Sequence, residues 1–229
     1  MNKYLQDFLG DITWVFREAD ELEVIGERSF NCSKEFEETF PSLTKLLNKA
    51  RITKILYRNQ YYELFGWTNL DFQSFGWLCL EPKKEEDIIK QLHPDHIILL
   101  KSFGGITERW NEPEDTWLVN LNNALTYEDA QNGTKGYEEL FNEICADEGI
   151  EINLNTDDFI SFAFEANGNV TMYHKQSGEV LMLAHDHNFD FITPFEIYPE
   201  YTLYKFNNCR TFSDWIEKIA VQMLNHIHN

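Results

Sequence analysis

The sequence predicts an α+β fold in which an antiparallel meander packs against helices and a long helix closes the chain. Three observations lead to this prediction. Apolar residues recur at helical spacing in several segments before residue 150, β-forming runs separated by turn signals fill residues 159–187, and a capped amphipathic pattern occupies residues 211–227. Helices followed by antiparallel strands and a closing helix are typical of α+β proteins.

The first fifty residues are expected to contain two helical regions. Residues 4–17 carry apolar side chains at helical spacing, namely Tyr4, Leu5, Phe8, Ile12 and Val15. Ser33 is the expected N-cap of the second region, which Pro41 interrupts and residues 43–50 continue.

Two prolines are predicted to begin successive helices within residues 81–106. Pro82 precedes three acids, residues 85–87, which suit the positive N-terminal end of a helix. Pro94 begins the second helix, and Gly104 with Gly105 ends it. The other predictions before residue 150 are one or two strands in residues 52–67, strands at 77–80 and 116–121, and a helix at 136–149.

The meander and the closing helix have the clearest signals for where each element begins and ends. Asn167-Gly168 and Ser177-Gly178 are tight-turn signals that divide residues 159–187 into three strands. Thr211 or Ser213 can cap the last helix. Its apolar stripe consists of Phe212, Trp215, Ile216, Ile219, Met223 and Leu224.

Composition indicates a folded protein of the cytoplasm with no membrane association. Hydrophobic residues make up 43% of the chain and aromatic residues 15%, which suffices for a core. No apolar run approaches the ~20 residues that span a bilayer, and the N-terminus lacks the apolar region of a signal peptide. The cysteines Cys32, Cys79, Cys145 and Cys209 lie far apart without CxxC spacing, so we expect free and mostly buried thiols.

The net charge limits the possible partners. The chain has 19 basic and 39 acidic residues, for a net charge of −20. Such a surface repels nucleic acid and anionic lipid, so neither is an expected partner, and it attracts a basic protein. The alternative is that the acids only keep the protein soluble.

The stretch "AHDHNFD" raises the question of a metal site. His185 and His187 are two residues apart on a predicted strand and so face one side, but zinc needs three or four protein ligands. With a two-residue turn at Ser177-Gly178, His174 lies opposite Leu181, roughly 13 Å along the strands from His185. Motifs of hydrolases, phosphate loops and dinucleotide sites are absent. We therefore expect no metal, no cofactor and no catalytic residue.

An acidic segment with two tryptophans is the best candidate for an interaction surface. Residues 108–151 contain twelve acids and two bases, Arg109 and Lys135, so their net charge is 2 − 12 = −10. Aromatic anchors surrounded by charge suit a protein interface. The predicted partner-binding residues are Trp110, Glu112, Glu114, Asp115 and Trp117. The alternative is a solvated loop whose tryptophan rings fold back into the core.

Three stretches, taken in order, resemble a known family. Residues 83–106 show a helix, a proline step, a second helix and a Gly-Gly end; residues 157–186 show central strands with turn glycines; residues 209–219 show a Thr-Phe entry into the closing helix. This order is similar to the SUKH superfamily, which includes the yeast cell-wall-assembly-regulator type and many bacterial immunity proteins. "LHPD" departs from the commoner Leu-Pro step by inserting His93.

The resemblance implies a curved sheet packed against helices in residues 83–229. It does not account for residues 1–82, which we expect to form a helical and strand-containing extension packed on that core. It also implies a protein without catalysis that binds and neutralises a cognate toxin, and it carries over no contact residues. With the acidic surface, the predicted function is an immunity-type inhibitor of a basic, nuclease-like toxin. The alternatives are an intracellular scaffold or regulator on the same fold, and a metal-dependent hydrolase that uses His185 and His187.

Overall fold

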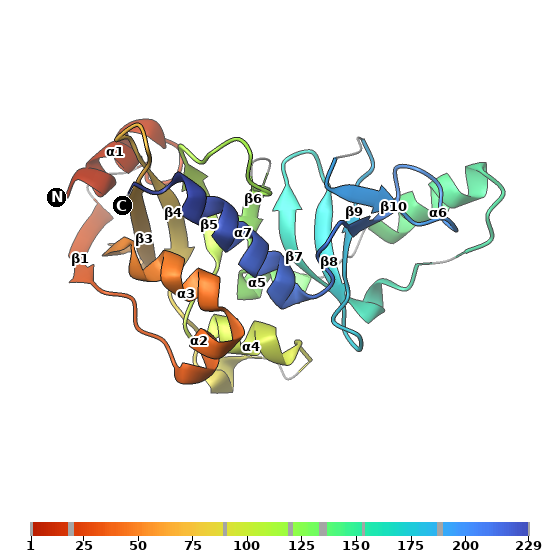
Figure 1. Ribbon diagram of the computed structural model, residues 1–229, viewed down its shortest axis with the longest axis horizontal. Coiled ribbons are helices and arrows are strands. Elements are labelled where there is room, and N and C mark those ends of the chain that lie inside the picture. Colours follow the sequence, from red (N-terminus) through yellow and green to blue (C-terminus); the bar gives the residue numbers. More distant parts are fainter. Residues whose placement is uncertain are drawn as a thin grey trace.

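A computed structural model describes residues 2–17, 21–88, 91–118, 121–132, 137–152, 154–186 and 190–228 (Figure 1). Its strands form one curved, open antiparallel sheet in the order β1-β2-β3-β4-β5-β6-β7-β8-β9-β11-β10. The strands are β1 (Leu22–Arg28), β2 (Arg51–Tyr57), β3 (Gln60–Thr68), β4 (Ser74–Leu80), β5 (Ile106–Trp110), β6 (Leu121–Ala124), β7 (Phe159–Glu165), β8 (Val170–His174), β9 (Val180–Leu183), β10 (Ile192–Pro194) and β11 (Leu203–Phe206). The α+β prediction is confirmed.

Helices cover both faces of this sheet. They are α1 (Lys3–Asp11), α2 (Lys34–Thr39), α3 (Pro41–Asn48), α4 (Pro94–Leu100), α5 (Tyr127–Asn132), α6 (Tyr137–Asp147) and α7 (Phe212–His226). The closing helix α7 crosses one face beside α3, and α1 packs against β3 and β4 (Figure 1). Figure 1 also shows α6 projecting at the end of the molecule opposite α1.

The helices predicted near the N-terminus are present, but the first one is shorter than predicted. Ser33 accepts a hydrogen bond from the Phe36 N–H and caps α2, as predicted. Pro41 does interrupt the helical region, but it is also the first residue of a separate helix, α3, whereas the sequence predicts that the helical region continues only from residue 43. The first helix ends at Asp11 rather than at residue 17. The chain then turns, which places Phe16 back in the cluster formed by Phe8 and the α1 side of the sheet.

The hairpin β2–β3 confirms two strands in residues 52–67. Tyr57 pairs with Gln60, and the two turn residues Arg58 and Asn59 have positive φ of 48° and 65°. Such a turn matches the twist of the strands and usually contains glycine, so its sequence gives a weak signal. Strand β1 was not predicted, because an edge strand that is mostly exposed has no apolar alternation.

Two predictions in the middle of the chain are wrong. The helix expected after Pro82 is only a 3-10 turn, Glu85–Asp87, because the Lys83 N–H donates to the Leu100 carbonyl at 2.8 Å and holds the chain extended beside α4. The strand expected at 116–121 is absent at 116–118, and residues 119–120 lie outside the described residues. Strand β6 begins only at Leu121. Helix α4, from Pro94, is confirmed.

The division at residue 82 does not separate two cores. It falls between β4 and β5, which pair directly, with Gly76 opposite Trp110. One apolar cluster joins Phe36 of α2, Trp77 of β4 and Met223 of α7. Residues 1–82 are therefore part of the same sheet and core rather than an extension added to it.

Candidate interaction surface

The two tryptophans of the acidic segment are in the core. Trp110 ends β5, is 2% exposed, and meets the Phe8 ring edge-on at a centroid distance of 5.3 Å. Trp117 is 9% exposed and its centroid lies 5.2 Å from that of Phe191. The prediction that these rings are exposed anchors is wrong. Burying so large an apolar surface stabilises the fold more than the local acidity opposes it.

Glu112 is a partly buried carboxylate that holds the segment in place. It accepts hydrogen bonds from the Trp77 indole N–H and from the Thr116 hydroxyl, each at 3.3 Å. Burial raises the pKa of the Glu112 carboxyl to about 7, although nearby Arg109 and both hydrogen bonds act to lower it. Arg109 is itself partly buried, and its Nε donates to the Leu121 carbonyl at 2.7 Å.

Glu114 and Asp115 are the two predicted contact residues that reach solvent. Asp115 forms an ion pair with His226 at the end of α7, with 2.8 Å between Oδ1 and Nε2. The Trp117 N–H donates to the side chain of Gln222 at 3.1 Å. The segment is thus tied to α7 at Asp115 and at Trp117. The contact role of Glu112, Glu114 and Asp115 stays a prediction.

The C-terminal residues connect this acidic segment to the turn between β3 and β4. Ile227 forms an isolated bridge with Asn69, and the His228 N–H donates to the Thr68 carbonyl at 2.9 Å. In that turn Leu70 is 59% exposed and Phe72 is 66% exposed. Sequence reasoning missed both; the available signal was two apolar residues inside an otherwise polar turn.

A cleft of about 570 Å³ separates this turn from α1. Its charged lining residues are Lys3, Asp7, Asp11 and Glu112. The Asn111 side chain donates to Asp11 at 2.9 Å and to the Ser74 carbonyl at 3.2 Å, so it joins α1 to β4 across the cleft. The exposed turn and the cleft lie at one end of the sheet, beside the acidic segment.

A second group of exposed acids lies on α6, at the opposite end of the molecule (Figure 1). Phe141 and Cys145 bury the inner side of α6 against the sheet residues Val170 and Leu183. Its sequence, YEELFNEICAD, contains no base. All charged side chains of α6 are therefore acidic.

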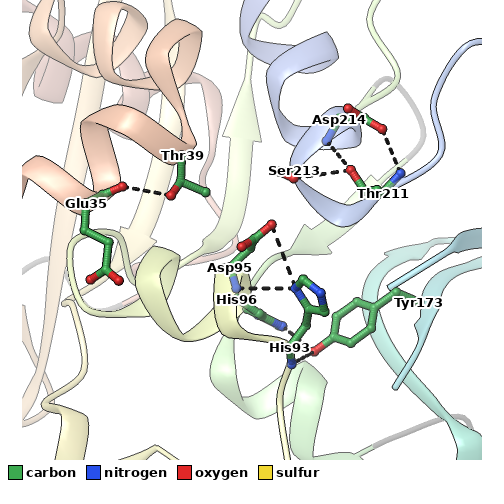
Figure 2. A network of polar contacts seen from close by, with 9 residues as sticks. All are labelled: Glu35, Thr39, His93, Asp95, His96, Tyr173, Thr211, Ser213 and Asp214. Carbon is green, nitrogen blue, oxygen red and sulfur yellow. Dashed lines mark hydrogen bonds and ion pairs between the residues drawn. The ribbon is translucent and has the colours of Figure 1, made fainter. Parts of the chain in front are cut away.

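A buried polar cluster joins α4 to β8 (Figure 2). The Tyr173 hydroxyl lies 3.1 Å from the backbone nitrogen of His93 and 3.1 Å from Nδ1 of His96. Burial lowers the pKa of His96 to about 3, so its ring is neutral in the folded protein. Its ring packs against Phe212 of α7, and both His96 and Tyr173 are buried, whereas His93 is partly exposed.

The histidine stretch has a different register from the predicted one. Met172, not His174, is opposite Leu181, because the turn before β9 is longer than two residues. The ring Nε2 of His185 donates to the Asn167 carbonyl at 2.6 Å. His187 lies outside the described residues, and within those residues no three His, Cys, Asp or Glu side chains are placed to hold a metal ion.

No family model, curated protein or solved structure matches the chain. The SUKH resemblance therefore remains a prediction from the order of the motifs. In the part of the chain that the structure describes, no helix has the length and apolar character needed to cross a membrane.

Proposed function

We propose that the protein is a non-catalytic immunity-type inhibitor that binds and neutralises a basic, nuclease-like toxin. The observation that supports this most is the exposure of the acids in residues 108–151. Those that the structure places at the surface are Glu114, Asp115, Glu128, Glu138, Glu139, Glu143, Asp147, Glu148 and Glu151. Arg109, the only base among the described residues of this segment, is partly buried.

Such a surface can compete for a basic groove. A nuclease binds phosphate through basic side chains, and a protein that presents carboxylates to them blocks the groove. Long-range attraction also speeds the encounter, which benefits an inhibitor that must act before the toxin does. The four cysteines are free and three are buried, as expected for a protein that works in the reducing cytoplasm, where we place it.

The test is a tagged pulldown from the native host at low salt, with mass spectrometry and an activity assay of the captured protein. We expect one basic protein at near one-to-one ratio, released by salt, whose toxicity disappears when the chain is present. A captured protein that keeps its full activity would reject the inhibitor function. Several weak partners without toxicity would instead favour an intracellular scaffold.

A further inference from the structure

We propose that the turn Asn69–Gln73 is the anchor of the interaction surface: Leu70 and Phe72 enter an apolar pocket of a basic protein segment, whose cationic side chain occupies the adjacent cleft. This deepens the proposed function, on which it rests for the basic character of the partner. Phe72 is the most exposed of the large apolar side chains described, at 66%. Such residues, fully desolvated at the centre of a contact, contribute most of the binding energy.

The turn holds its two apolar side chains in one arrangement. The Asn69 side chain accepts from the Asp71 N–H at 3.0 Å and from the Gln73 N–H at 2.9 Å. The Phe72 N–H donates to the Asn69 carbonyl at 3.0 Å. A partner therefore meets a turn that is already ordered, and binding loses little conformational entropy.

Phe72 occupies a backbone position that does not favour it. Its φ is +62°, a region that bulky side chains rarely adopt and that asparagine or glycine tolerates. Its ring meets only the edge of the fold, with the His228 ring at a centroid distance of 4.5 Å. Since little of the ring is buried within the chain, burial against a partner is what would compensate for the disfavoured backbone.

The neighbouring cleft has the chemistry to receive a cation. Asp7 and Asp11 of α1 line it, and Lys3 is directed to the Phe72 carbonyl at 3.5 Å. Ser74 also lines it, and its buried hydroxyl has no hydrogen-bond partner among the described residues. Side chains alternate along β4, so Ser74 lies on the same side as Leu78, which packs with α1. Ser74 therefore places a buried hydroxyl without a described partner on the side of the sheet that α1 and the cleft occupy.

The negative charge of the protein determines which kind of partner can bind at the turn and the cleft. A second copy of the chain, also at −20, is repelled, as is an anionic bilayer. A partner segment that alternates basic and apolar side chains can contact both the apolar turn and the acidic cleft. Its apolar side chains meet Leu70 and Phe72 while an arginine or lysine reaches Asp7 and Asp11.

The test uses short labelled peptides with the full chain at low salt. We expect a peptide of alternating arginine and leucine to bind at least about tenfold more tightly than one of arginine and serine, and one of glutamate and leucine not to bind. NMR shifts should map to the Asn69–Gln73 turn and α1. Absence of binding, equal affinity of the first two peptides, or shifts elsewhere would overturn the inference.

The variants are Phe72→Asn and, as a matched control, Tyr201→Asn. Tyr201 is also an exposed aromatic residue with positive φ, at +64°, but it lies near β11 at the other end of the sheet. Asparagine suits both backbones, so both variants should fold. We expect Phe72→Asn to weaken binding of the arginine-leucine peptide about tenfold or more and Tyr201→Asn to leave it unchanged. Equal effects would overturn the inference.

The toxin assay separates this inference from the proposed function. If Phe72→Asn neutralises a captured toxin as well as the unaltered chain does, the anchor is wrong and the inhibitor function stands. If peptide binding depends on Phe72 while no toxin is neutralised, the anchor stands and the inhibitor function is wrong.

Discussion

The carboxylate of Glu112 accepts a hydrogen bond from the indole N–H of Trp77 at 3.3 Å, so an acid from the most acidic part of the chain serves as an internal partner for the core. This hydrogen bond fixes the loop that follows β5 against β4. Its neighbours Trp110 and Trp117 are buried, while Glu114 and Asp115 remain outside.

Glu112→Gln is expected to stabilise the protein above pH 7. The pKa of this carboxyl rises from 4.5 to about 7 on folding, so its contribution to stability is present below pH 4.5 and is lost as pH rises through 7. Glutamine can accept from Trp77 and donate to the Thr116 hydroxyl without carrying charge. Thermal unfolding should show a gain on the order of 1 kcal/mol at pH 8 and little gain at pH 5. An equal effect at both values would contradict the buried carboxylate.

His96→Gln should flatten the loss of stability on acidification. The pKa of His96 falls from 6.5 to about 3 on folding, so the unfolded chain binds a proton that the folded chain does not. Stability is therefore lost as pH falls below 6.5, by about 2 kcal/mol between pH 7 and pH 5. The variant should be less stable than the native protein at pH 7, because it loses the contacts of the His96 ring, but it should lack this part of the slope. Urea unfolding at a series of pH values measures it, and parallel curves would refute it.

Trp110→Ala should cost about 3–5 kcal/mol of unfolding free energy, because it empties a space between Phe8 and the sheet. The comparison is Trp14→Ala, since Trp14 is 54% exposed and its indole donates to Glu108 at 2.8 Å. That variant should lose roughly 1 kcal/mol or less. Denaturant unfolding of the pair gives the answer, and similar losses would mean that Trp110 is not a core residue.

Gly76→Ala is expected to prevent normal folding. A Cβ at Gly76 would overlap the Phe65 carbonyl oxygen and the Trp110 ring, and a backbone atom cannot move aside. The expected loss exceeds about 4 kcal/mol. Gly10→Ala is the control, because a Cβ there meets nothing within 4 Å and the helix gains by roughly 0.5–1 kcal/mol. Circular dichroism and thermal unfolding would detect both, and a stable Gly76→Ala protein would disprove the close packing.

Glu114→Lys and Glu143→Lys compare the two acidic regions as contact sites. Each replaces an exposed acid, one beside the Asn69–Gln73 turn and one on α6. If the partner binds at the turn, Glu114→Lys should slow association about tenfold and Glu143→Lys much less, because charge steering is strongest near the contact. Association rates at low and high salt measure this. A larger effect at Glu143 would move the contact to α6.

Local sequence signals predicted the elements that carry their own caps and turns. Ser33 and Pro94 mark helix starts correctly, Pro41 interrupts the second helical region as expected, and Thr211 forms one of the two expected caps of α7. The three strands of the meander also follow their turn signals, with Gly168 and Gly178 at positive φ. These choices depend on hydrogen bonds and backbone angles within a few residues, so a short window of sequence contains them.

The candidate site depended on contacts that no short window contains. Strands β10 and β11 are only three and four residues long and the edge strand β1 is mostly exposed, so none has a pattern that a short window recognises; each forms because a neighbour offers backbone partners. Tertiary packing decides which aromatic rings face solvent. The Trp110 ring is buried between Phe8 and Gly76, whereas the Phe72 ring is mostly exposed.

The sequence alone thus determined the α+β class, the capped helices and an acidic chain of net charge −20. Only the tertiary structure decided that residues 1–82 share the core and that Trp110 and Trp117 are buried. It also decided that Leu70 and Phe72 stand exposed beside an acidic cleft. The reason is physical: hydrogen bonds of caps and turns are local, whereas burial depends on surfaces that meet only after distant segments pack.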